Sequence, residues 1–186
     1  MNLNEQIKQY KPTNPKESKD QEMIVNYMTR FNNLLTRENE LAHFTSSAWV
    51  VNRARTKVLM VYHNIYQSWS WVGGHADGDA DLLHVALKET QEETGLKNLS
   101  SVSESIYSLE ILEVPAHIKK GKPIAKHLHL NLTYLIEADE NEKTSIKPDE
   151  NSGVEWMSLD DAVKACSEYE MKVIYQKLNE KLKEYK

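Results

Sequence analysis

The sequence contains very little cysteine, since Cys166 is the only one among 186 residues. A disulfide framework or a cysteine-based zinc site needs partner thiols, which this sequence does not offer. Long apolar runs are also missing, because no stretch approaches the ~20 apolar residues that span a bilayer. Residues 1–5 have neither the basic nor the apolar region of a secretory signal. These absences predict a cytoplasmic protein with no membrane partner.

The chain also lacks an excess of one charge, except in a single segment. Its formal net charge is −5, and residues 74–96 alone contain six acidic side chains and one basic side chain. The rest of the chain is therefore balanced, with 22 acids and 22 bases. Concentrated negative charge repels a nucleic-acid backbone and attracts cations. We expect no direct nucleic-acid binding at this segment.

Length and composition indicate one globular domain with an extension. Apolar residues make up 40% of the chain and charged residues 27%, as in ordinary globular proteins. Asn14 and Pro15 have the pattern of a helix start, followed by apolar residues at helical spacing. We predict an N-terminal helical extension over residues 1–40 and a main domain over residues 41–186. The extension is expected to carry no chemistry, and a homodimer is left open.

Periodicity and turn signals predict the elements of the main domain. Two strands should form a β-hairpin, and an aromatic loop over residues 66–71 should follow it. Gly95 should end the acidic helix in a left-handed conformation. The predicted strands are 43–51, 57–63, 106–114, 125–137 and 153–157, and the predicted helices are 81–94, a short one from residue 158 and an amphipathic one near the C-terminus.

Three glutamates of the acidic helix are the main candidates for chemistry. Glu89, Glu92 and Glu93 stand at positions i, i+3 and i+4, so their side chains lie within roughly a 100° arc of the helix. Like charges at these spacings oppose the helix by ~0.2–0.5 kcal/mol per pair, and a hard divalent cation would reverse that effect. Such an arc alone is more often a solvated surface. The glycines Gly73 and Gly74 ahead of the helix favour a site, because they allow close approach of the backbone to a ligand.

The stretch from Gly74 to Leu96 resembles the Nudix box. That pattern is Gly, five residues, Glu, seven residues, Arg-Glu, an aliphatic residue, any residue, Glu-Glu, any residue, Gly and an aliphatic residue. Three of its nine defined positions depart, with Ala80 for the first Glu, Lys88 for Arg and Thr90 for the aliphatic residue. Asp79 or Asp81 could substitute for the missing Glu, whose role in the family is mainly to hold the loop on the helix. The six matching positions are Gly74, Glu89, Glu92, Glu93, Gly95 and Leu96.

The resemblance covers roughly residues 41–165 and implies a fold and an activity. The fold would be an α/β/α sandwich with a mixed β-sheet. The activity would be that of a pyrophosphohydrolase that cuts a phosphoanhydride bond in a small phosphorylated metabolite: a nucleoside diphosphate linked to another moiety, or a nucleoside triphosphate. The departures leave open a second hypothesis, a non-catalytic nucleotide-binding module with the same fold.

The resemblance also implies the cofactor and its ligands. Glu89, Glu92 and Glu93 would bind Mg²⁺ or Mn²⁺, and one of them, which the sequence does not identify, would accept the proton of the attacking water. Glu150 is a weaker candidate for a further metal ligand or base.

Several other residues are candidates for substrate binding, each with a structural alternative. His127 and His129 share one face of a predicted strand and could contact phosphate, or they could be ordinary sheet histidines. A zinc site built on this pair would need a third protein ligand, which the sequence does not suggest. His75 lies beside Gly73 and Gly74, and Trp71 could stack on a base or pack in the core.

Overall fold

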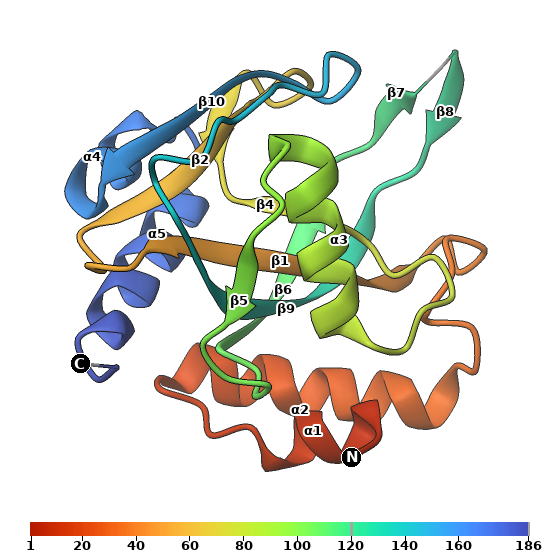
Figure 1. Ribbon diagram of the computed structural model, residues 1–186. Coiled ribbons are helices and arrows are strands. Elements are labelled where there is room, and N and C mark those ends of the chain that lie inside the picture. The colour runs from red at the N-terminus through yellow and green to blue at the C-terminus, as the bar shows by residue number, and fades with distance from the viewer. Residues whose placement is uncertain (120, 186) are drawn as a thin grey trace. The chain divides into compact units, whose positions relative to one another are not determined.

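The computed structural model of the protein describes residues 1–119 and 121–185 (Figure 1). The chain forms two compact units, each built from three stretches. The first unit consists of Met1–Ser47, Gly74–Val85 and Glu104–Tyr134, and the second of Ala48–Gly73, Ala86–Ser103 and Leu135–Lys186. The predicted division into an extension, residues 1–40, and a main domain, residues 41–186, cuts the chain once along the sequence, whereas each compact unit combines separate stretches. The predicted division stays a prediction.

The first unit begins with two helices, α1 (Leu3–Gln9) and α2 (Pro15–Arg30), which lie side by side (Figure 1). The predicted start of α2 is confirmed, because Oδ1 of Asn14 accepts a hydrogen bond from the backbone N–H of Glu17 at 2.9 Å and Pro15 follows the cap. The sequence reading missed α1, which a capping box of Asn2 and Glu5 begins.

The strands of the first unit include β6 (Ser108–Val114), which pairs antiparallel with the first part of β9 (His127–Ala138). Helix α2 docks on β6 through acidic side chains: the Ser108 hydroxyl donates to Glu17 at 3.1 Å, and the Ile111 N–H donates to Asp20 at 3.0 Å. These bonds explain how two carboxyl groups of α2 are buried. The unit contains further strand segments. They are the first half of β1 (Ala42–Asn52), the end of β4 (Val72–His75) and a hairpin of β7 (His117–Lys119) and β8 (Lys122–Ile124).

The strands of the second unit centre on β2 (Lys57–His63). The second half of β1 pairs antiparallel with it, with Val51 opposite Val58, so the predicted hairpin is confirmed. Strand β10 (Asn151–Ser158) and the short strand β3 (Ser68–Ser70) also pair antiparallel with β2. The prediction of a loop over residues 66–71 is therefore wrong for its centre, where a strand of three residues is too short to show alternation. Strand β5 (Leu99–Ser101) pairs with the end of β9.

The helices of the second unit are α4 (Leu159–Ala165), α5 (Tyr169–Leu182) and most of α3 (Leu82–Thr94). Helix α5 buries one stripe, as its sequence predicts, and Tyr175 on that stripe packs against Trp49 with ring centroids 5.1 Å apart. The predicted short helix is confirmed as α4, with Ser158 as its N-cap. The predicted α/β class with a mixed sheet is confirmed.

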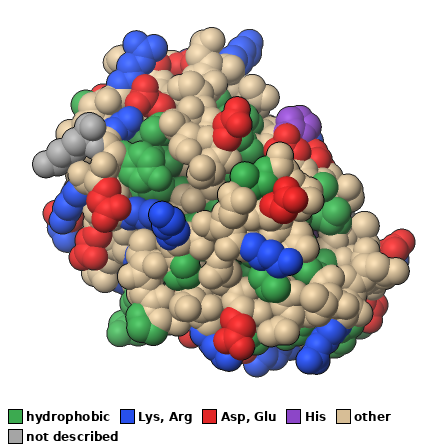
Figure 2. All heavy atoms as spheres, turned by 90° about the horizontal axis from the view of Figure 1, so that it is seen from below, with side chains coloured by type: hydrophobic (Ala, Val, Ile, Leu, Met, Phe, Trp, Pro, Cys, Tyr) green, Lys and Arg blue, Asp and Glu red, His purple; other side chains and the backbone are tan. Residues whose placement is uncertain are grey.

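The surface carries both signs of charge. Figure 2 shows Lys, Arg, Asp and Glu side chains interspersed with hydrophobic ones over the face that it draws. Among the described residues, no helix has both the length and the apolarity needed to cross a membrane. The cytoplasmic location stays a prediction.

Candidate active site

Helix α3 positions the central carboxylates, and its C-terminus is fixed by Gly95. This glycine has φ +74°, and its N–H donates to the Gln91 carbonyl at 3.0 Å, so the predicted left-handed cap is confirmed. A Cβ at Gly95 would lie 2.2 Å from Oγ of Ser145. The loop that contains Ser145 can therefore lie directly against the helix end only because residue 95 is glycine.

That loop brings Glu150 to the helix. The Ser145 N–H donates to the Thr94 carbonyl at 2.8 Å, and the Glu150 carbonyl accepts from the Asn64 N–H at 2.9 Å. Asn151 is fully buried, and its side-chain amide donates to the carbonyl of Glu93 at 2.9 Å. The sequence reading missed Asn151 as a positioning residue, because no local pattern shows which distant carbonyl its amide meets.

Three of the four predicted metal ligands come together in the second unit. Glu89, Glu93 and Glu150 each offer one carboxylate oxygen, and these atoms all lie within 4.8 Å of one another. Glu93 is only 3% exposed, and its Oε1 accepts a hydrogen bond from the Gly73 N–H at 3.2 Å. Carboxylate oxygens are the ligands that Mg²⁺ and Mn²⁺ prefer, so the donor set fits the expected cofactor.

The electrostatics of this cluster also fit a cation. The pKa of Glu93 is raised to about 8, mainly by burial and also by the charges of Glu150 and Glu89, while the Gly73 hydrogen bond and Lys147 oppose the shift. Burial and the neighbouring Glu92 raise the pKa of Glu89. Without an ion these carboxyl groups therefore favour their protonated forms, and a divalent ion would stabilise the ionised carboxylates.

Glu92, the remaining predicted ligand, is not part of this group among the described residues. Its carboxylate is 3.2 Å from Nζ of Lys147 and 3.8 Å from Nζ of Lys88. Lys147 also lies 3.1 Å from Glu150. Burial alone would lower the pKa of Lys147, but its hydrogen bonds to Glu150 and Glu92 raise it above the usual value. Lys147 thus stays charged and links two of the acids.

Two of the three departures from the box pattern, Thr90 and Ala80, have local structural explanations. Thr90 is fully buried, and its hydroxyl donates to the Ala86 carbonyl at 2.7 Å, so it fills an aliphatic position without an unpaired polar atom. Asp79, one residue before Ala80, lies 2.7 Å from Nδ1 of His84 and accepts from the Asp81 N–H at 2.8 Å. These contacts hold the loop at the start of α3 without the missing glutamate.

The sequence model of the NUDIX domain matches residues 42–178, which is most of the chain. The chain belongs to the Nudix family. This confirms the resemblance seen in the box and supports a hydrolase.

Individual relatives agree with the family. The chain is 32% identical over 112 residues to the m7GpppN-mRNA hydrolase NUDT17 of Xenopus laevis, a match that covers 57% of this chain. The chain spans only 36% of that relative's length. Among solved structures it is similar to an Ap4A hydrolase of C. elegans (21% identity, 76% of this chain and 96% of that one, TM-score 0.55). It is also similar to the Nudix hydrolase RenU of M. smegmatis (16% identity, 74% and 84%, TM-score 0.55). The solved structures support the Nudix fold alone.

The residues predicted to bind substrate fall in both units. Trp71, in the second, is 9% exposed; its backbone N–H donates to the Tyr175 hydroxyl at 3.0 Å, and its ring packs against Tyr175. This placement favours core packing, the alternative left open by the sequence. Gly73 belongs to the same unit and Gly74 to the first, as neighbours in β4.

The predicted histidines come together in the first unit with one that the sequence reading missed. The rings of His75, His127 and His129 all lie near the ring of His43, with centroids 4.9–5.2 Å from it. Burial lowers the pKa of His43, and burial together with the neighbouring imidazoles lowers that of His129 to about 2. Nothing in the sequence near His43 indicates this cluster, because β1 and β9 are far apart in the chain.

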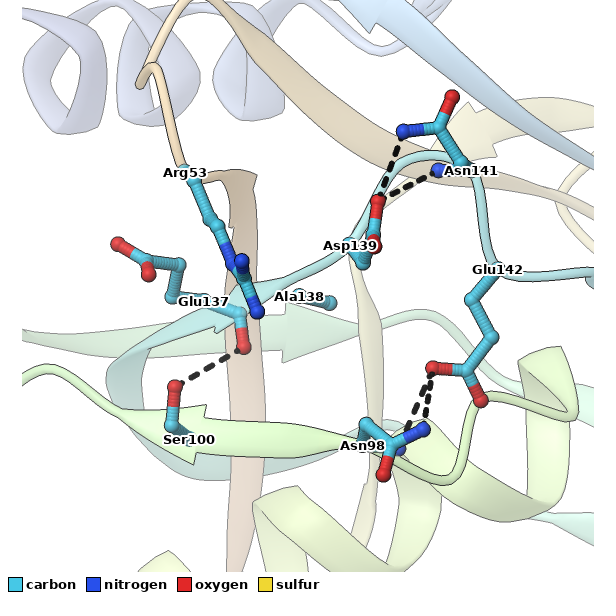
Figure 3. A pocket seen from close by; sticks show the side chains of 8 residues that line it. All are labelled: Arg53, Asn98, Ser100, Glu137, Ala138, Asp139, Asn141 and Glu142. Carbon is cyan, nitrogen blue, oxygen red and sulfur yellow. Dashed lines mark hydrogen bonds between the residues drawn. The ribbon is translucent and has the colours of Figure 1, made fainter.

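A surface hollow of about 310 Å³ lies elsewhere in the second unit (Figure 3). The Asp139 carboxylate accepts hydrogen bonds from Asn141, and the Glu142 carboxylate accepts from Asn98, so these acids are already paired (Figure 3). None of the predicted Nudix site residues lines this hollow, whose full lining is Arg53, Asn98, Ser100, Glu137, Ala138, Asp139, Asn141 and Glu142.

Proposed function

We propose that the protein is a divalent-metal-dependent pyrophosphohydrolase. Its substrate would be a nucleoside diphosphate linked to another moiety, or a nucleoside triphosphate, in which water attacks phosphorus. The observation that carries the proposal is the meeting of Glu89, Glu93 and Glu150 oxygens within 4.8 Å, with Glu93 buried. A buried carboxylate among other acids is costly unless a cation is present, so the arrangement is more readily explained by a metal site than by a solvated surface.

Each residue of the cluster has a role in this proposal. Glu89, Glu93 and Glu150 would hold Mg²⁺ or Mn²⁺, and the bound ion would supply charge neutralisation for the pyrophosphate and a more acidic water. The Gly73 N–H and the Asn151 amide keep Glu93 in place. Lys147 holds Glu92 beside the cluster. Glu92 would serve as a further ligand or would accept the proton of the attacking water.

We further propose that substrate contacts come from residues that the sequence singled out. Gly73 and Gly74 would allow phosphate groups to approach the backbone, and the histidines His75, His127 and His129 would contact phosphate oxygens. Trp71 would contribute through its packing in the core rather than by stacking on a base. The name of one relative, an m7GpppN-mRNA hydrolase, supports a nucleotide-linked substrate. We propose a small nucleotide or phosphorylated metabolite as the partner, without binding of a nucleic-acid strand.

A substrate panel tests the proposal. Purified protein is incubated with Mg²⁺ or Mn²⁺ and with nucleotide sugars, dinucleoside polyphosphates and nucleoside triphosphates, and release of phosphate or monophosphate is measured. We expect turnover that chelation abolishes and that Glu93→Gln lowers by at least about 100-fold. Glu104→Gln, at an exposed glutamate of the first unit, is the control and should keep wild-type rates.

Two results would contradict the proposal. Equal turnover in Glu93→Gln and the wild type would refute the assignment of Glu93 to a catalytic metal site. Tight nucleotide binding that ignores added metal, without turnover of any substrate, would instead establish the non-catalytic binding module.

A further inference from the structure

Four of the seven histidines in the chain form one cluster in the first unit. His43 lies on β1, His75 at the end of β4, and His127 and His129 on β9. His43, His75 and His129 each offer one ring nitrogen, and these three nitrogens lie within 4.8 Å of one another. His127 and His129 alone are too few ligands for a zinc site. The structure adds His43 and His75, which come from two other strands.

A second observation that points to a bound ion is a buried nitrogen of His43 with no hydrogen-bond partner among the described residues. His43 is 4% exposed, and its Nδ1 lies 3.0 Å from the carbonyl of Asn39, to which it donates. Nε2 of His43 must then carry the lone pair, and among the described residues it has no hydrogen-bond partner although it is buried. A carbonyl that fixes one ring nitrogen and leaves the other available is the usual arrangement around a metal-binding histidine.

We propose that His43, His75 and His129 form a second metal site that binds a zinc-class divalent ion. Three imidazole nitrogens select Zn²⁺ and its transition-metal neighbours over Mg²⁺, whose preferred ligands are oxygens. Zinc–nitrogen bonds of about 2.0–2.1 Å place tetrahedral ligand atoms about 3.4 Å apart, so the three nitrogens need to approach by at most about 1.5 Å. On binding the ion, rotation of the His75 and His129 rings would supply this approach. The fourth position stays open to water or to an oxygen ligand.

His127 is a positioning residue for this site. Its Nδ1 donates to the Ala125 carbonyl at 2.9 Å, and its Nε2 lies 3.3 Å from Nε2 of His129. With the proton of His127 committed to Ala125, the close nitrogen of His127 accepts from His129 and orients that ring. His127 is 7% exposed, so water has little access to its contact with His129 and the surrounding packing keeps the two rings in place.

Metal titration of the full-length protein tests the site without using catalysis. Protein stripped with chelator is placed in millimolar Mg²⁺ to fill oxygen sites, and Zn²⁺ is then titrated by calorimetry. We expect one equivalent of zinc with micromolar or tighter affinity, and X-ray absorption of the bound zinc should show imidazole nitrogen ligands. His75→Gln and His129→Gln should each weaken binding by at least about tenfold.

Two matched variants test whether the zinc is bound by these histidines rather than elsewhere on the protein. His84→Gln changes an exposed histidine that contacts Asp79, and it should leave zinc affinity unchanged. Glu93→Gln should also keep the zinc equivalent, so that the outcome does not depend on the proposed hydrolase activity.

The proposal is overturned if no zinc equivalent appears above the Mg²⁺ background. It also fails if the absorption spectrum of the wild type shows only oxygen ligands, or if folded His75→Gln and His129→Gln bind zinc as tightly as the wild type.

Discussion

Replacing Glu93 by glutamine should stabilise the metal-free protein while it abolishes the proposed activity. The folded pKa of Glu93 is raised from 4.5 to about 8, mainly by burial. Below pH 4.5 the carboxyl group is protonated in both the folded and the unfolded chain. As the pH rises towards 8, the unfolded chain loses this proton while the folded chain keeps it, so the wild type loses stability and the glutamine variant does not.

The size of the effect follows from the shift. Each pKa unit corresponds to about 1.4 kcal/mol, so the full shift corresponds to at most about 5 kcal/mol. Water that enters the acidic cluster would reduce this free-energy difference. We therefore expect the free energy of unfolding of Glu93→Gln to exceed that of the wild type by between about 2 and 5 kcal/mol at pH 8. The glutamine can retain the hydrogen bond from the Gly73 N–H, because its amide oxygen can take the place of the carboxylate oxygen.

Urea denaturation in chelator between pH 4.5 and 8.5 measures this difference. The free energies of unfolding of the two proteins should nearly coincide at the acidic end and separate as the pH rises. Saturating Mn²⁺ should make the wild type the more stable of the two proteins, because the ion binds the folded wild type more tightly than the folded variant. Glu92→Gln is the control on the same helix; the Glu92 side chain is 43% exposed, and the loss of each of its ion pairs with Lys147 and Lys88 should cost roughly 0.2–1 kcal/mol. A gap between wild type and Glu93→Gln that does not grow with pH would refute the reasoning.

Three further changes test the supports of the site. Gly95→Ala should destabilise the protein by about 1–3 kcal/mol in thermal unfolding, more than Gly78→Ala, because Gly78 also has positive φ but has no atom within 4 Å of an added Cβ. Equal losses would show that the close loop contact at Gly95 is unimportant. Asn151→Ala removes the buried bond to the Glu93 carbonyl and should cost about 1–3 kcal/mol, with a lower kcat at unchanged substrate KM. Full kcat in that variant would mean that Asn151 does not position the site. Lys147→Met should tighten Mn²⁺ binding by about tenfold in calorimetry, because it removes a cation beside the carboxylates; weaker binding would contradict this role.

The outcomes for individual elements show where local patterns suffice. Helix α3 and its end were predicted because the spacing of Glu89 and Glu93 and the glycine at position 95 act within one or two turns. Strand β3 was missed because Ser68–Ser70 has too few residues for periodicity and forms only through its pairing with β2. Helix α1 was missed although its capping box is local, because Asn2 and Glu5 are followed by few apolar residues.

The sequence by itself determined the family, the order of most elements and the acidic helix, since all of these depend on residue type and spacing along the chain. Tertiary structure alone decided which carboxylates meet. It selected Glu150 over Glu92 as the third member of the cluster, through hydrogen bonds of Ser145 and Asn151 to the end of α3. It also brought His43 to His75 and His129, because distances between strands depend on sheet pairing, which a single sequence does not specify.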